Sequence, residues 1–437
     1  MNVNVNPMLD YWCQVASGKW QSATCFFFLT TAFIFFLVGC GTEQNVAADT
    51  AVPQSGNGNP TIIVDATAEG TAVDPRIFGS NAPAWLGASR LENQTFINRT
   101  KAAGITLIRL PGGSWSNWYP WLECEQNNEA VCASWIADPT DFINFLQATG
   151  AEGMYTVNQN RTAKEAAALV AFFNGDVNDD RDIGVDVQGP DWGKVSDWAQ
   201  LRADHGNPNP INIKYFEVGN EIYGATQASG GSNCASWGWE DVWTCDGTEY
   251  VNGIGSGSNR KEGFKEFQTI MQWVDPSVEV GAVGVSFLEG WSDEFGEEVI
   301  AEAGDIMEFY IIHQYAYNDP PSSMSAALAA PQSMWAPMRE NVDDMIEQHS
   351  SGSCPALAVT EYNMFAFDSG DSGQWMTRNV NMLFMADTIG QLIANEFDIA
   401  TQWDLANGTA GKGTDYGLMN ADTYARAPQY YAFPLWA

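Results

Sequence analysis

Two carboxylates at the ends of apolar, strand-like runs are the residues best suited to chemistry. The run YFEVGNE, residues 215–221, ends in Glu221, and the run LAVTEYN, residues 357–363, contains Glu361. Because a strand carries buried side chains until it emerges, each carboxylate is expected at the mouth of a sheet or barrel. Glycosidic bond cleavage needs one carboxyl group as acid/base and a second as nucleophile. This pair therefore predicts hydrolysis of sugars.

The elements that must position this pair are strands alternating with helices. A Pro after Asp138, and Thr162 followed by Glu165, are typical helix starts. Such alternation is the pattern of parallel βα units. It predicts an α/β fold, a (β/α)8 TIM barrel over residues 61–437. The predicted strands are residues 76–80, 106–110, 153–157, 213–218, 278–285, 307–315, 356–361 and 399–405.

Polar residues follow or end most of these strands, and they are the candidate site residues. In a barrel of this kind, the C-terminal ends of the strands meet at one face. More polar groups stand at these positions than packing alone requires, so we expect an active site there. The residues are Asn81, Arg109, Asn158, Asn220, Glu221, His313, Tyr315, Glu361, Gln402 and Trp403.

Four short motifs resemble those of glycoside hydrolase family 51, the α-L-arabinofuranosidase family. They are RLPGGS at residues 109–114, FEVGNE at 216–221, HQY at 313–315 and TEYN at 360–363. The resemblance covers the chain from about Thr61 onward and keeps the order expected for the family. It implies a retaining hydrolase that acts on arabinose-containing polysaccharides or oligosaccharides and needs no cofactor.

The resemblance also implies a role for each matching residue. Glu221 is the expected general acid/base, Glu361 the nucleophile, and Asn220 the partner of the sugar 2-hydroxyl. Arg109 and Tyr315 are expected to hold Glu361. A retaining mechanism requires carboxyl groups about 5–5.5 Å apart. The charge of Arg109 should lower the pKa of Glu361, and facing that carboxylate should raise the pKa of Glu221.

Further contacts with the sugar are expected from residues around this pair. Ser114 and Gln402 match sugar-contacting positions of the family, and Trp403 follows Gln402 directly. His313 is also a candidate, expected to act through hydrogen bonds rather than as a metal ligand, since the chain has only three histidines. Tryptophans in two loops, at residues 115–121 and 237–243, suit stacking on sugar faces, although packing of the loops explains them equally well.

Two departures from the family keep other substrates open. The family usually has a Glu after the first strand, but residues 78–83 read FGSNAP. The family also carries a C-terminal β-sandwich, which we expect to be absent or truncated because the sequence ends at Ala437. A β-glycanase or β-xylosidase of the same clan is therefore an alternative. A second alternative is a non-catalytic glycan-binding surface lipoprotein, against which the presence of both Glu221 and Glu361 argues.

The N-terminus predicts export from a bacterial cell. An apolar run from Cys25 to Gly39 is short for a membrane span and ends in LVGC at Cys40. We expect residues 1–39 to be a lipoprotein signal, Cys40 to carry lipid, and residues 40–60 to be a flexible tether. The protein would then be anchored in the membrane, the outer one by preference, facing the periplasm or cell surface. An ordinary anchor or secretory signal is the alternative.

Cysteine usage and charge agree with export. Cys124 with Cys132, and Cys234 with Cys245, form close pairs in loops and predict two disulfides, while Cys354 is expected to be a buried thiol. The net charge of −35 argues against binding to nucleic acid. The acidic segment Asp176–Asp182 resembles the start of a Ca²⁺ loop but lacks its glycine and closing glutamate, which favours a solvated loop over a calcium site.

Overall fold

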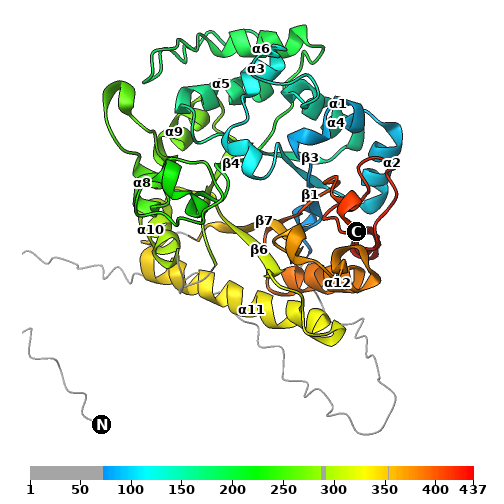
Figure 1. Ribbon diagram of the computed structural model, residues 1–437. Coiled ribbons are helices and arrows are strands. Elements are labelled where there is room, and N and C mark those ends of the chain that lie inside the picture. Colours follow the sequence, from blue (N-terminus) through cyan, green and yellow to red (C-terminus); the bar gives the residue numbers. More distant parts are fainter. Residues whose placement is uncertain (1–71, 287–291, 353) are drawn as a thin grey trace, which may run out of the picture. The chain divides into compact units, whose positions relative to one another are not determined.

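The computed structural model describes residues 72–286, 292–352 and 354–437 (Figure 1). The predicted signal, Cys40 and the predicted tether lie outside the described residues. Among the described helices, none combines the length and the apolar character needed to cross a membrane.

Parallel strands β1 to β8 close into a barrel in sequence order, with β1 paired to β8. The predicted (β/α)8 barrel is therefore confirmed, and each predicted strand overlaps an observed one. Strand β1 is shorter than predicted because residues 75–77 form a 3-10 turn, whereas β6 and β7 extend further. The strands are β1 (Gly79–Asn81), β2 (Leu107–Leu110), β3 (Glu152–Val157), β4 (Tyr215–Val218), β5 (Glu279–Val283), β6 (Phe309–Tyr317), β7 (Ala356–Phe365) and β8 (Ile399–Gln402).

Helices follow the strands in sequence and surround the barrel (Figure 1). The expected N-caps are present: the Asp138 carboxylate accepts a hydrogen bond from the backbone N–H of Asp141, and Thr162 accepts one from Glu165. The helices are α1 (Ala88–Leu91), α2 (Gln94–Ala103), α3 (Trp121–Glu125), α4 (Pro139–Thr149), α5 (Ala163–Asn174), α6 (Val195–Asp204), α7 (Gln227–Gly230), α8 (Gly247–Asn252), α9 (Phe264–Val274), α10 (Asp293–Ala303), α11 (Met324–His349), α12 (Asn379–Ala394) and α13 (Phe433–Trp436).

The interior of the barrel changes from apolar to polar toward the C-terminal ends of the strands. An apolar cluster contains Leu107, Met154, Tyr215, Ile311, Ala358 and Ile399. Side chains two residues apart in a strand point to the same face. The next layer toward the C-terminal ends of the strands therefore consists of the residues two positions after those of the apolar cluster. That layer consists of Arg109, Thr156, Glu217, His313, Thr360 and Thr401, and it supports the candidate site.

Both predicted disulfides are present, with Cα–Cα distances of 5.0 Å for Cys124–Cys132 and 5.7 Å for Cys234–Cys245. The prediction of a buried thiol at Cys354 is wrong. Cys354 is exposed and disulfide-bonded.

Candidate active site

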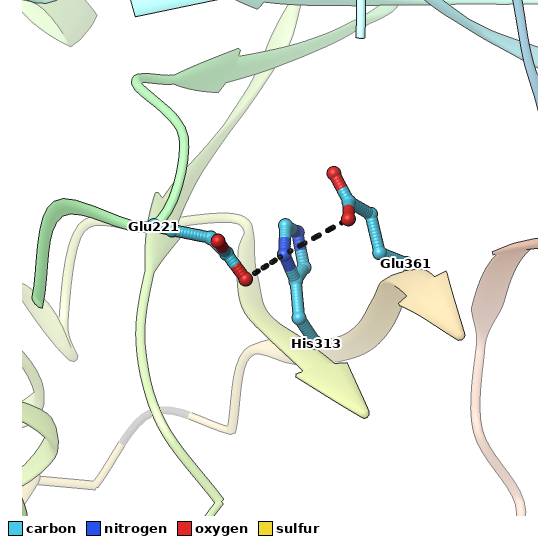
Figure 2. Close-up of side chains that lie close together, drawn as sticks. All are labelled: Glu221, His313 and Glu361. Atoms are coloured by element: carbon cyan, nitrogen blue, oxygen red, sulfur yellow. Dashed lines mark hydrogen bonds and ion pairs between the residues drawn. The ribbon is translucent and has the colours of Figure 1, made fainter. Parts of the chain in front are cut away.

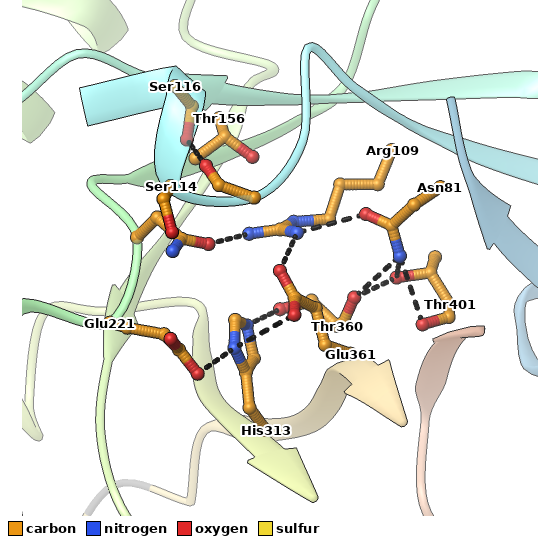
Figure 3. Close-up of polar contacts among 12 residues, drawn as sticks. Asn81, Arg109, Ser114, Ser116, Thr156, Glu221, His313, Thr360, Glu361 and Thr401 are labelled. Atoms are coloured by element: carbon orange, nitrogen blue, oxygen red, sulfur yellow. Dashed lines mark hydrogen bonds and ion pairs between the residues drawn. The ribbon is translucent and has the colours of Figure 1, made fainter. Parts of the chain in front are cut away.

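Arg109 is the hub of the polar layer (Figure 3). Its guanidinium is fully buried and donates to four side chains. Nε contacts Glu217 at 2.5 Å, Nη1 contacts both Asn81 and Glu361 at 2.9 Å, and Nη2 contacts Asn220 at 2.8 Å. The acceptors lie in, or within two residues of, strands β1, β4 and β7. Arg109 is therefore a rigid, buried support for Glu361 and Asn220.

Glu361 lies in β7 and is nearly buried. Arg109 donates to its Oε1, and the Tyr315 hydroxyl donates to its Oε2 at 2.7 Å. A register shift between β6 and β7 pairs His313 with Glu361 instead of Thr360. The two contacts expected for Glu361 are thus present in the structure, and they fix the orientation of its carboxylate.

Glu221 stands in a tight turn after β4. Gly219 has φ 80°, and a Cβ there would lie 2.5 Å from Ile222. Glu221 itself has φ 43°, an uncommon backbone conformation for a residue with a side chain. Its carboxylate accepts from Tyr223 Oη at 3.1 Å and from Trp239 Nε1 at 2.5 Å. The turn therefore aims the side chain toward Glu361 across the barrel mouth.

His313 lies between the two carboxylates (Figure 2). Its Nδ1 is 3.0 Å from Glu221 Oε1 and 3.7 Å from Glu361 Oε2, and its Nε2 is 3.0 Å from Thr360 Oγ1. One ligand-type atom from each of Glu221, His313 and Glu361 lies within 4.8 Å of the others. The two glutamates, 140 positions apart in sequence, therefore face each other at short range.

The pKa order of the pair is the reverse of the prediction. Burial raises the pKa of Glu361, and the charges of His313 and Arg109 offset this only in part. Burial also acts on Glu221, but hydrogen bonds from His313, Trp239 and Tyr223 lower its pKa below the usual value. The prediction failed because His313 hydrogen-bonds Glu221, and because Arg109 divides its donors between Glu361 and Glu217.

Two buried charges below the pair complete its electrostatics. Burial opposes ionisation of Glu217, yet Arg109 and His313 bring its pKa to about 2. Burial likewise disfavours the His313 cation, but Glu361, Glu217 and Glu221 raise its pKa to about 10. At neutral pH the layer therefore contains the Arg109 and His313 cations and the Glu217 anion.

Asn220 and Ser114 meet at a third carboxyl group, Glu240. Ser114 Oγ is 2.6 Å from Glu240 Oε1, and Asn220 Nδ2 donates to the same oxygen at 3.1 Å. Asn117 Nδ2 donates to Oε2 at 2.7 Å. Burial and the charge of Glu221 raise the pKa of Glu240 to about 8.

Other candidate residues take different positions. Gln402 is fully buried, with its amide bonded to Ser80 Oγ and the Tyr416 carbonyl oxygen. Asn158 donates to the Tyr119 carbonyl oxygen. In this structure neither is brought to the carboxylate pair, so a sugar contact by Gln402 stays a prediction.

Trp403 packs on the Pro-Gly-Gly loop after β2. A Cβ on Gly113 would lie 2.4 Å from Trp403 Cη2, so only glycine leaves room for the ring. From Trp403, a row of neighbouring rings leads through Trp85 and Trp115 to Trp118. Trp118 is 44% exposed. The row thus joins the site to the surface.

The second tryptophan group lies on the other loop. Trp237 and Trp239 stack with ring centroids 6.1 Å apart, and Trp237 is 57% exposed. Trp121, by contrast, is buried in the main core. Packing explains Trp121, whereas Trp118 and Trp237 are partly exposed to solvent.

Sequence reasoning missed Glu217, Glu240 and Asn117. Glu217 carried a signal, since a charged residue inside a buried strand demands a partner such as Arg109. Glu240 and Asn117 lie in loops, and no spacing rule connects them to the strands. Their contribution appears only when the loop after β4 is placed over the barrel.

A metal ion could be held by only one cluster among the described residues, Glu221 with His313 and Glu361. A protonated His313 offers no lone pair to a metal at neutral pH, which disfavours this use. In the segment at residues 176–182, Asp179 pairs with Arg181 and Asp180 with Lys194. Calcium binding there stays a prediction.

No family model matches the chain. A probable α-L-arabinofuranosidase C from Aspergillus fumigatus is 27% identical over 140 residues, which are 30% of this chain and 24% of that protein. An intracellular exo-α-(1→5)-L-arabinofuranosidase from Streptomyces lividans is 24% identical over 273 residues, 56% of this chain and 35% of that protein. The matched stretches thus span about a quarter to a third of these curated relatives.

Solved structures share the fold. A family 51 α-L-arabinofuranosidase from Bifidobacterium longum has a TM-score of 0.62 at 18% identity, over 85% of this chain and 75% of that one. The Thermotoga maritima α-L-arabinofuranosidase has 0.59 at 19%, over 83% and 72%. A Paenibacillus polymyxa family 44 xyloglucanase has 0.50 at 14%, over 84% and 76%. The neighbours include family 51 α-L-arabinofuranosidases, which confirms the resemblance indicated by the motifs. The relatives and neighbours named here are glycoside hydrolases.

Proposed function

We propose that this protein is a retaining glycoside hydrolase that removes α-L-arabinofuranosyl groups from polysaccharides or oligosaccharides. The observation that carries the proposal is the pairing of Glu221 with Glu361, whose nearest atoms lie within 4.8 Å. Such closeness favours double displacement over inversion, because an inverting pair stands about 6.5–9.5 Å apart to admit water. The names of the relatives support arabinofuranosides as substrates.

In the first step, Glu361 attacks the anomeric carbon as the bond to the leaving oxygen breaks. Glu221 gives its proton to that oxygen, and a glycosyl ester forms on Glu361. In the second step, water attacks the anomeric carbon, Glu221 takes the water proton, and Glu361 is released. Arg109 and Tyr315 hold the attacking carboxylate in position throughout.

The resting pKa order must change before the first step. Glu221 has to be protonated and Glu361 ionised, the reverse of the order in the substrate-free site. A proton has only to move from Glu361 to Glu221, whose nearest atoms lie within 4.8 Å, while His313, with a pKa of about 10, stays charged and keeps Glu361 ionised. Sugar binding would favour this transfer by separating the carboxylate pair from water.

A panel of p-nitrophenyl glycosides tests the proposed substrate. We expect turnover of the α-L-arabinofuranoside to exceed that of the β-xyloside and of β-glucan. Glu361→Ala should lose turnover by about 10⁴-fold or more while still binding the sugar. Azide should restore its activity and yield the glycosyl azide of inverted configuration. No furanosidase turnover by the unmodified protein would defeat the proposal.

A β-glycanase of the same clan is the second candidate. The partly exposed indoles of Trp118 and Trp237 favour it, since aromatic side chains on two loops suit contact with a polymer chain. The fold shared with a xyloglucanase is compatible with this reading. Release of oligosaccharides from β-glucan or xyloglucan faster than arabinose from arabinan would select this candidate.

A further inference from the structure

The disulfide-closed segment Cys234–Cys245 lies directly against the acid/base turn. Its backbone is tied to the chain after β4, with Trp239 N–H donating to the Gly224 carbonyl oxygen at 2.9 Å and Thr226 N–H donating to that of Glu240 at 2.8 Å. Two consecutive side chains then reach two consecutive site residues. Trp239 contacts Glu221, and Glu240 contacts Asn220.

Glu240 is buried, and its surroundings fix which atoms donate to it. Asn117 Oδ1 accepts from the Asn220 backbone N–H at 2.9 Å, so Asn117 Nδ2 must face Glu240. Asn220 Oδ1 accepts from Arg109 at 2.8 Å, so Asn220 Nδ2 must face it too. Both carboxyl oxygens of Glu240 therefore accept from amides that have no other orientation.

The consequence for Asn220 is a locked amide. Arg109 holds the Oδ1 atom of Asn220, and Glu240 accepts one N–H of its Nδ2. The second N–H of Nδ2 is left for a ligand. Burying a donor amide without its acceptor is costly, so losing Glu240 would let Asn220 turn away. Asn220 directly precedes the acid/base in sequence.

We propose that Glu240 is a positioning residue that fixes the Asn220 amide, and thereby makes the enzyme demand a hydroxyl group beside the anomeric carbon of its substrate. This inference rests on the proposed function, because the hydroxyl is the sugar 2-hydroxyl that Asn220 would contact. Glu240 acts without touching the sugar. Its contribution is to keep one N–H of Asn220 aimed at the substrate, where the contact strengthens in the transition state.

The test compares two aryl α-L-arabinofuranosides, one with the 2-hydroxyl and one 2-deoxy. The measured quantity is the ratio of kcat/KM between them, which cancels intrinsic reactivity when proteins are compared. We expect Glu240→Ala to lower this ratio by about 10-fold or more, the scale of one lost hydrogen bond to substrate. Asp241→Ala, which removes the next carboxylate of the same loop, should leave the ratio unchanged.

Glu240→Met keeps the volume and protects the test against a misfolded alanine variant. Its side chain presents no strong acceptor to Asn220, so the same fall in the ratio is expected. Melting temperatures establish that each variant is folded. An equal loss of kcat/KM on both glycosides would show that Glu240 has only a structural role. That result would overturn this inference and leave the proposed function standing. Absence of turnover of either glycoside by the unmodified protein would instead remove the proposed function, and this inference with it.

Discussion

Arg109 and Glu217 form a fully buried ion pair beneath the catalytic candidates. Holding the pKa of Glu217 at about 2 rather than 4.5 corresponds to about 3 kcal/mol of stability. The sign follows from the lowered pKa: this stability is present above pH 4.5 and is lost as the pH falls toward 2. Glu217 therefore stabilises the cation that orients Glu361.

We expect Glu217→Gln to lower the free energy of unfolding by about 3–5 kcal/mol, because Arg109 keeps its charge without a buried partner. Urea denaturation at pH 7 measures the change. Glu279→Gln is the matched control, since it breaks a part-exposed pair with Lys214 and should cost less than about 1 kcal/mol. Equal losses in the two variants would contradict the assignment.

The charge of His313 leads us to expect an effect on the pH profile of kcat/KM. Its cation lowers the pKa of both Glu221 and Glu361, against the effect of burial. His313→Asn removes that charge, so both pKa values rise and less ionised nucleophile is present in mild acid. The acidic limb of kcat/KM should then move to higher pH. The His349→Asn control, at a half-buried histidine on α11, should leave the profile in place. An unmoved acidic limb in His313→Asn would refute the role.

At the residue scale, the sequence predicted those site residues that lie at the ends of strands or within the four motifs. The structure brings together four of them with the expected contacts: Glu221, Glu361, Arg109 and Tyr315. This was predictable because the alternation of side chains along a strand determines which of them point into the barrel, as well as their order. The pKa order could not be predicted. It depends on which carboxylate the imidazole of His313 meets, and that follows from a register shift invisible in sequence.

Among the elements, the loop after β2 shows how a short motif acts through space. Gly113 has φ 65° and lies under the ring of Trp403, which follows β8. The Pro-Gly-Gly motif is thus needed for close approach of a distant aromatic residue. Ser114 follows Gly113 directly, so any shift of this loop also moves the Ser114 contact with Glu240.

We expect Gly113→Ala to lower kcat/KM by about 10-fold or more, because the new Cβ would clash with the Trp403 ring and shift the loop that carries Ser114. It should also cost about 1–2 kcal/mol for the left-handed backbone. Gly150→Ala separates these effects: Gly150 has φ 77° but open space around its Cβ. That control should lose similar stability with unchanged kinetics. Full activity in Gly113→Ala would show that the packing is not required.

The strands and helices of the barrel were predictable one by one, since each apolar run indicates a strand and each capping pattern indicates the start of a helix. The positions of the loops were not predictable in this way. Sequence predicted a disulfide between Cys234 and Cys245 but not that the segment between them delivers Trp239 and Glu240 to the site. Such loop positions depend on tertiary contacts, for which local patterns carry no signal.

For the whole molecule, the predicted lipid anchor remains a proposal about residues outside the described part. We expect Cys40→Ala to move the protein from the membrane fraction to the soluble fraction, because the thiol is the attachment point. Labelling with a palmitate analogue measures the modification. Cys25→Ala, within the predicted signal, should keep both label and membrane association. A membrane-bound, labelled Cys40→Ala variant would exclude lipidation at Cys40.

The central claim is that Glu221 and Glu361 act as a retaining pair. Proton NMR of the first sugar released from an aryl α-L-arabinofuranoside tests it most directly, before mutarotation mixes the anomers. The account predicts that the α-anomer appears first. First release of the β-anomer would mean direct attack by water and would contradict the double displacement on Glu361.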